Sequence, residues 1–368
     1  MSGWSVLVYA VVPPDLEDAL QADLAEANMA LETMRSESPV HVHVNIVRPA
    51  VETFELWPPP GNDNNLPDAT ASGSLSELLA SARCWQEAGE FDSTGEVDGD
   101  GRALGRRGRL LVLWGHGARA FATRSAESSV RGGEEAVAVV AAESSVPDGD
   151  EVVGAFVRND IPPPDIVGYD ACQMATVSTI RALSEAFPAA VFIGSMVPEP
   201  ASGWPYFQLL SILAQPRTAD AVAAAVVEAY AGSVSVPDWC MVAVSLAEVS
   251  KTGMGLTAAI RQLMATTAPD RVRFFAAADG ADIHEDTNVA DLGALMRRLV
   301  AQGPNQEAAD VGDAIHSCRV TRRAAGTLAG RDGIGVRLGL PWGKGDPNDH
   351  DWPIPPQQPS WPDYLPDV

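Results

Sequence analysis

Three nearly uninterrupted apolar runs constrain the fold of this chain more than any other feature of its sequence. They are RLLVLWGHG at 109–117, DIVGYDAC at 165–172 and AAVFIGSMV at 189–197. Strands with one solvent-exposed face alternate apolar and polar residues, whereas strands covered on both faces do not. The three runs therefore predict a parallel sheet with helices packed on both of its faces.

Two βαβ units favour the same architecture. The first joins the strand WSVLVYAVV to the strand VHVHVNIV through a helix that begins near Pro14. The second places the helical pattern QMATVSTIRALSEAF between the second and third apolar runs. We expect an α/β/α sandwich with a mostly parallel central sheet.

The sequence pattern changes after residue 248. Helices are predicted at 254–267, at 288–302 and from 305 to about 322, and a last strand is predicted at 333–342. The remaining residues are rich in Pro, Trp and Asp, which is typical of extended or disordered chain. The chain is accordingly divided into a core at 1–248, a mainly helical C-terminal subdomain with a late strand at 249–342, and a tail at 343–368.

The charge balance excludes several classes of partner. The chain has 25 Lys and Arg against 49 Asp and Glu, a formal net charge of −24. Such an excess of acid repels polynucleotides and anionic membranes, so neither is expected as a partner. The apolar N-terminal segment has no basic start and no small-residue cleavage site, and no run approaches the roughly 20 apolar residues of a membrane span. We expect a cytoplasmic protein of undetermined oligomeric state.

The cysteines and histidines do not form a metal-binding pattern. Cys84, Cys172, Cys240 and Cys318 are widely spaced and include no CxxC pair, which argues against a disulfide framework or a zinc site. His41 and His43 lie on one face of a strand but have no third ligand nearby. No metal site is predicted.

Two reactive residues follow predicted buried strands, and they open onto the same cleft if these strands are neighbours in the sheet. His116 ends the first apolar run and Cys172 ends the second, and the carboxyl ends of parallel strands open onto a common crevice. A thiol beside an imidazole forms a nucleophilic dyad. Cys172 is also expected to lie directly at a helix N-terminus, and the backbone N–H groups of Gly117 and Cys172 are candidates for an oxyanion hole.

The chain resembles the clostripain family of cysteine peptidases, which are relatives of caspases, gingipains and legumain with a caspase-like α/β/α fold. The resemblance covers nearly the whole chain. It is carried in order by the segments WSVLVYAVVPPDLEDAL, LLVLWGHG, IVGYDACQMATV, IGSMVPEPASGWPY, VADLGALM and GIGVRLGLPW.

The resemblance implies a role for each matching residue. Cys172 is implied as the nucleophile and His116 as the general acid and base, in a dyad that needs no third residue. Asp170 occupies the family position in the S1 pocket, and its carboxylate suits a substrate Arg or Lys. Three residues of the loop after the next strand are candidates for the pocket walls or for a structural loop: Ser195, Glu199 and Trp204.

Some relatives cut themselves after a basic residue between the histidine and cysteine strands. Arg131, and second to it Arg124, are the predicted autoprocessing sites. No cofactor is required, although some relatives use Ca²⁺ and the acidic segment at 346–351 could bind it. The function predicted is a cysteine endopeptidase that cleaves proteins or peptides after Arg or Lys. The alternatives are a catalytically silent caspase-like scaffold that binds a protein partner, and an unrelated α/β enzyme.

Overall fold

A computed structural model describes the greater part of the chain. The described residues are 3–34, 40–47, 52–56, 75–81, 108–117, 145–251, 255–265, 283–284 and 289–337. The predicted autoprocessing sites and the C-terminal tail lie outside these ranges. Within them, no helix is both long and apolar enough to cross a membrane.

The centre of the molecule is an eight-stranded sheet in the order β10-β7-β6-β5-β4-β1-β2-β3. Its five inner strands from β6 to β2 run parallel, whereas β3, β7 and β10 are antiparallel to their neighbours. The mostly parallel sheet predicted from the apolar runs is therefore confirmed. The strands are β1 (Trp4–Val11), β2 (Val40–Val47), β3 (Glu52–Leu56), β4 (Gly108–Gly115), β5 (Ile166–Asp170), β6 (Val191–Gly194), β7 (Trp239–Ser245) and β10 (Arg319–Ala325).

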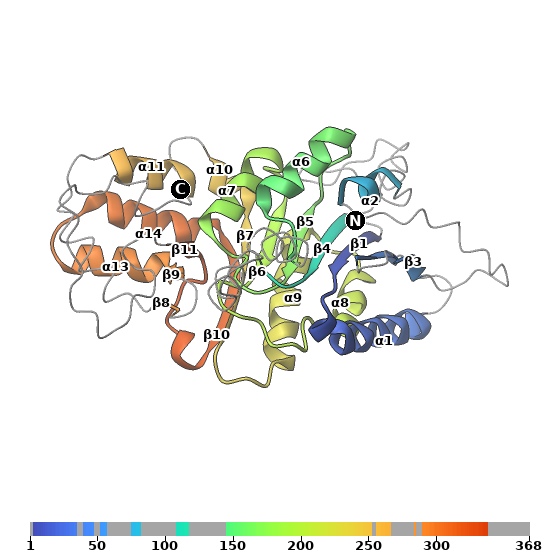
Figure 1. The fold of residues 1–368 in the computed structure, drawn as a ribbon. Coiled ribbons are helices and arrows are strands. Elements are labelled where there is room, and N and C mark those ends of the chain that lie inside the picture. The colour runs from blue at the N-terminus through green and yellow to red at the C-terminus, as the bar shows by residue number, and fades with distance from the viewer. Residues whose placement is uncertain are drawn as a thin grey trace, which may run out of the picture.

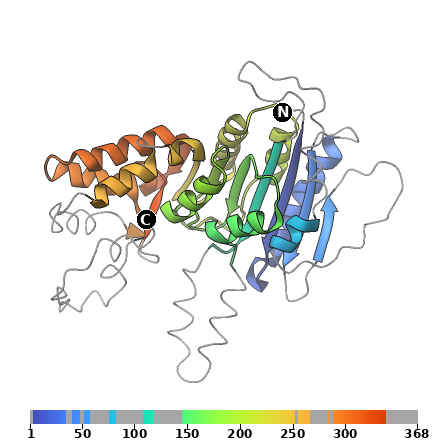
Figure 2. The same ribbon diagram turned by 90° about the horizontal axis from the view of Figure 1, so that it is seen from above.

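Helices cover both faces of this sheet, as Figures 1 and 2 show. One face carries α1 (Glu17–Met34), α8 (Tyr206–Leu213) and α9 (Ala219–Ser233). The other carries α2 (Leu75–Ser81), α6 (Gly149–Asn159), α7 (Val177–Ala186) and α10 (Leu246–Ser250). These layers are the α/β/α sandwich expected from the sequence.

Two buried clusters, one on each face, explain why the apolar runs are continuous. In β1, Val6 and Val8 pack toward α1, whereas Leu7 and Tyr9 pack toward the opposite helices. Successive side chains of a strand point to opposite faces, so a strand buried on both faces needs apolar residues at every position.

The described residues of the C-terminal part add three helices and a small sheet. The helices are α11 (Leu256–Ala265), α13 (Leu292–Ala301) and α14 (Gln306–Cys318), and the three-stranded sheet contains β8 (Ile283–His284), β9 (Val289–Asp291) and β11 (Gly335–Arg337). The helix predicted from 305 to about 322 is too long, because β10 starts at Arg319 and pairs with β7 of the main sheet. The domain boundaries at 248 and 342 stay predictions.

A buried carboxylate ties this part together. Asp291 is fully buried and accepts hydrogen bonds from the backbone N–H groups of Ala294, Asp332 and Gly333 at 2.7–2.8 Å. It thereby begins α13 and fixes the approach to β11. The N–H of Gly335 in β11 then donates to the carbonyl of Ala175 at 2.7 Å, which joins the C-terminal part to the loop that follows β5.

Gly168 in the middle of β5 provides space for an aromatic ring. A Cβ at this position would lie 2.5 Å from Cη2 of Trp204, whose side chain is completely buried. The missing side chain thus lets the loop before α8 pack directly on the sheet.

We expect Gly168→Ala to destabilise the protein by about 1–3 kcal/mol, because the indole has to move within a close-packed core. Gly312→Ala is the matched control, because Gly312 lies inside α14 with open space around it and should gain about 0.5–1 kcal/mol. Urea unfolding measures both. A Gly168→Ala protein as stable as the wild type would contradict the packing described.

Candidate active site

The register of β4 and β5 brings the two predicted reactive residues to the same place. Trp114 lies opposite Asp170 in this parallel pair. His116 and Cys172 each follow two residues later, so both lie at the carboxyl end of these adjacent strands. The structure therefore places the two predicted residues at the ends of adjacent parallel strands.

Cys172 lies in a tight loop between β5 and α7. Gln173 adopts a left-handed backbone conformation with φ of 60°, and its N–H donates to the carbonyl of Val197. The N–H of Ala175 donates to the carbonyl of Ser195. The expected direct junction of Cys172 with a helix is wrong, because α7 begins at Val177 after an N-cap at Thr176. A macrodipole acts mainly within its first turn, so α7 gives this thiol little help.

The Cys172 thiol is covered by the backbone of Glu199. The N–H of Glu199 donates to Sγ at 3.2 Å, and Sγ lies 3.9 Å from the carbonyl oxygen of Glu199. Burial, together with the carboxylates of Glu199 and Asp170, raises the pKa of Cys172 to about 11. The thiol is thus protonated in this conformation. Cys172 is still the most accessible described cysteine, since Cys240 and Cys318 are buried.

His116 contacts a carboxylate that no sequence pattern indicates. Nε2 of His116 lies 3.0 Å from Oδ2 of Asp15, in the turn that follows β1. The His116 side chain is 27% exposed and that of Asp15 is 66% exposed. The imidazole therefore lies at the rim of the site, within reach of solvent.

Gly117 is required by its contact with the cysteine loop. A Cβ at Gly117 would lie 1.6 Å from the carbonyl oxygen of Cys172, so no other residue fits there without moving one of the loops. The absence of a Cβ at Gly117 thus admits the protein's own backbone. The oxyanion hole formed by Gly117 and Cys172 stays a prediction.

Asp170 lies at the bottom of the site and is 5% exposed. Its Oδ2 accepts hydrogen bonds from the backbone N–H of Trp204 and from the hydroxyl of Tyr206, both at 3.1 Å. Burial raises the pKa of Asp170 to about 7, although these two hydrogen bonds oppose the shift.

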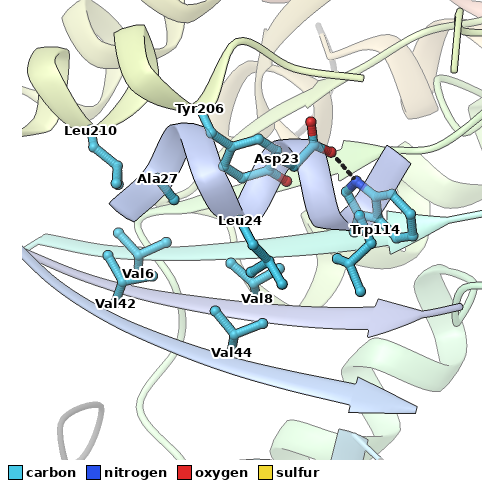
Figure 3. Close-up of a pocket in the computed structure, with 11 residues that line it drawn as sticks. Val6, Val8, Asp23, Leu24, Ala27, Val42, Val44, Trp114, Tyr206 and Leu210 are labelled. Carbon is cyan, nitrogen blue, oxygen red and sulfur yellow. Dashed lines mark hydrogen bonds between the residues drawn. The ribbon is translucent and has the colours of Figure 1, made fainter. Parts of the chain in front are cut away.

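A second carboxyl, Asp23 of α1, lies beside Asp170. A Cβ on Gly203 would lie 3.0 Å from Asp170 and 3.3 Å from Asp23, so this glycine separates the two groups with no space to spare. The indole Nε1 of Trp114 donates to Asp23 at 2.8 Å. Figure 3 shows Asp23 between Trp114 and Tyr206, at the polar end of a narrow cavity between α1 and the sheet. Burial and the nearby Asp170 raise the pKa of Asp23 to about 8.

Glu199 completes this group, which we call the acidic cluster (Asp23, Asp170 and Glu199). Within the described part of the chain, neither Glu199 carboxyl oxygen has a hydrogen-bond partner of normal geometry, and both are buried. Burial and the charge of Asp170 raise the pKa of Glu199 well above its usual value, while the N–H groups of Ala171 and Trp204 nearby lower it. The cluster therefore holds protons at neutral pH.

The remaining predicted pocket residues have structural contacts. The Ser195 hydroxyl donates to the carbonyl of Val197 and accepts from its N–H, which closes a local turn. Trp204 packs its ring on Gly168 and donates its backbone N–H to Asp170. Trp204 thus shapes the wall behind the acidic cluster, whereas the Ser195 hydroxyl holds the loop.

The described residues contain no group of three or more His, Cys, Asp or Glu side chains arranged to hold a metal ion. The acidic segment at 346–351, considered for Ca²⁺, lies outside them.

Comparison with known proteins places this fold and site in a family. The family model of the clostripain family, peptidase C11, matches residues 107–323, which include both His116 and Cys172. The chain therefore belongs to the clostripain family, and it is a cysteine peptidase by that membership. A comparison with curated proteins finds no match.

Solved structures of the same family share the fold. The secreted C11 cysteine protease iotapain from Bacteroides thetaiotaomicron superposes with a TM-score of 0.65 at 14% identity, over 91% of this chain and 93% of that one. An inactive zymogen C11 protease from Parabacteroides distasonis gives 0.60 at 13% identity, over 91% and 92%. A secreted B. thetaiotaomicron C11 protease in complex with an irreversible peptide inhibitor gives 0.55 at 18% identity, over 88% and 85%.

The residues that sequence reasoning missed are Asp15, Asp23 and Tyr206. Each contacts a partner far along the chain, such as Trp114 for Asp23. A polar residue on the otherwise apolar stripe of the first helix, at Asp23, is the one local signal that was present in the sequence.

The acidic cluster predicts a decline in stability as the pH rises. The folded protein keeps a proton on Asp23 up to about pH 8, whereas the unfolded chain releases it near the ordinary value of 3.8. Stability is therefore lost as the pH rises from about 4 through about 8. Asp23→Asn, which retains an acceptor for Trp114, should flatten this decline and gain on the order of 1–3 kcal/mol at pH 8.

Thermal unfolding between pH 5 and pH 8.5 measures this slope. Asp18→Asn is the control, because it removes an exposed carboxylate of the same helix and should leave the slope unchanged. Equal slopes in the wild type and Asp23→Asn would contradict the protonated cluster.

Proposed function

We propose that this protein is a cysteine endopeptidase that cleaves peptide bonds after Arg or Lys, with Cys172 as nucleophile and His116 as general acid and base. The observation that supports the specificity is the acidic cluster next to Cys172. Three buried carboxyls meet there, and the charged groups that act on Asp23 and Glu199 are themselves carboxylates. A guanidinium or ammonium group from a substrate would supply the missing positive charge.

The same cluster accounts for rejection of other side chains. A neutral side chain would leave the carboxyls without a cation, and an acidic one would add repulsion. A basic side chain allows Asp170 and its neighbours to release their protons and bind it as anions. Recognition of the cation is thus coupled to proton release.

The reaction proceeds in two stages. The Cys172 proton passes to His116 as the thiolate attacks the substrate carbonyl, and the N–H groups of Gly117 and Cys172 hold the oxyanion. The C–N bond breaks as His116 gives its proton to the departing amine, which leaves a thioester on Cys172. Water then attacks the thioester with His116 as base, and this releases the acid and restores the thiol.

Productive binding requires the loop at 198–203 to move. In the described conformation the backbone N–H of Glu199 is hydrogen-bonded to Sγ of Cys172 and covers it. The side chain of Asp170 is nearly inaccessible to solvent. A shift of the Glu199 backbone away from Sγ would uncover the nucleophile and would open the path to Asp170. The substrate class proposed for this site is protein or peptide with an accessible Arg or Lys, and no cofactor enters the reaction.

Peptides with Arg, Lys, Asp or Leu before a reporter group test the function directly. The wild type should cleave the first two, and Cys172→Ala should lower kcat by more than about 10⁴-fold, because the nucleophile is lost. Asp170→Asn should lower kcat/KM for the Arg peptide by about 10²-fold or more, with little change for Leu.

The controls separate the two halves of the proposal. Cys240→Ala removes a buried cysteine that the mechanism does not use, and it should keep wild-type kcat. Turnover that survives Cys172→Ala would refute the mechanism, and an Arg preference retained by Asp170→Asn would refute the pocket alone. A folded wild type that cleaves none of the four peptides would favour the scaffold function.

We also propose self-cleavage after Arg131, with Arg124 as the second site, both of which lie between the described residues 117 and 145. Wild-type protein should separate into two fragments on a denaturing gel, and Cys172→Ala should remain one band. Arg131→Ala should shift or abolish the cut, as mass spectrometry of the new termini would reveal. A single band from a fully active wild type would reject self-processing.

A further inference from the structure

The backbone around His116 is held by two glycines. A Cβ on Gly115 would lie 2.4 Å from the carbonyl oxygen of Val11 at the end of β1, and a Cβ on Gly117 would lie 1.6 Å from that of Cys172. Residues 115–117 are therefore packed between the end of β1 on one side and the loop after β5 on the other. The position of the His116 Cα is fixed by this packing, and the contacts of its side chain set the orientation of the imidazole.

The turn after β1 carries the group that contacts this side chain. The 3-10 helix Pro14–Leu16 follows Pro13, and two consecutive prolines restrict its backbone. The N–H of Leu16 donates to the carbonyl of Pro13 at 3.0 Å, which closes the turn. Asp15 in this turn presents Oδ2 to Nε2 of His116 at 3.0 Å.

We propose that Asp15 is a positioning residue for the catalytic histidine. Its carboxylate accepts a hydrogen bond from Nε2–H of His116, which fixes the ring rotation and the tautomer. This assigns proton exchange with the thiol and the leaving amine to Nδ1. The inference rests on the proposed dyad and adds to it a third residue from a segment that precedes His116 by 101 positions.

The exposure of Asp15 argues against a role in folding. Its side chain is 66% exposed, and an exposed ion pair contributes little to stability. A variant at this position should therefore unfold at the wild-type temperature. We therefore expect Asp15 to affect the rate of the reaction through the orientation of His116, and to affect the stability of the fold little.

Kinetics of three variants test the assignment. Asp15→Ala should lower kcat by about 10–100-fold with KM changed less than about twofold, because the ring loses its orientation while the acidic cluster is untouched. Asp15→Asn should reverse at least about a third of the decrease in log kcat that Asp15→Ala causes, because its amide oxygen still accepts from Nε2–H. Asp18→Ala removes a carboxylate of similar exposure nearby and should keep wild-type kcat.

A readout without turnover keeps the inference separate from the proposed function. In ¹⁵N-histidine protein, with the His116 signal assigned by its loss in His116→Gln, the neutral ring should carry its proton on Nε2. Asp15→Ala should give a mixture of tautomers. An inactive wild type with a pure Nε2–H tautomer would refute the peptidase function and support the positioning by Asp15.

Three results would overturn the inference. They are a mixture of tautomers in the wild type, a kcat of Asp15→Ala equal to that of Asp18→Ala, and an Asp15→Asn protein as slow as Asp15→Ala.

Discussion

The parallel pairing of β4 with β5 is the constraint on which the site depends. Their register sets Trp114 opposite Asp170, and it thereby brings His116 and Cys172 to the same edge of the sheet. A slip of one residue in either strand would turn its side chains to the opposite helices. The contact of Gly117 with the Cys172 carbonyl fixes that register again beyond the last ladder pair.

In the acidic cluster, the burial that suits a stable fold keeps neutral the groups that the proposed reaction uses as anions. Burial of three carboxyls is tolerated because they keep protons, and hydrogen bonds from Trp114, Trp204 and Tyr206 hold two of them in place. The same burial keeps the Cys172 thiol protonated while Glu199 covers it. Burial thus favours the neutral forms of the Cys172 thiol and of the carboxyls beside it, whereas the proposed reaction uses their anions.

The fold, and the placement of His116 and Cys172 at one edge of the sheet, could be predicted because their signals are local. Uninterrupted apolar runs indicate strands buried on both faces, and a polar residue directly after such a run marks the functional edge. The contacts of Asp15 and Asp23 join residues 101 and 91 positions apart, which no local pattern can pair. β10 carries no such local signal, because it is a half-exposed edge strand without apolar alternation, and its first residues continue the predicted helix.

Ser145 forms a β-bridge with His116, and the N–H of Val146 donates to the His116 carbonyl at 2.9 Å. The segment between residues 117 and 145 therefore starts and ends beside His116. A chain break anywhere inside it would divide the molecule into a piece carrying β1 to β4 and a piece carrying β5 to β11, with the β4–β5 ladder running between them. The two pieces would stay paired through this ladder as a heterodimer, and they would separate only when the sheet unfolds.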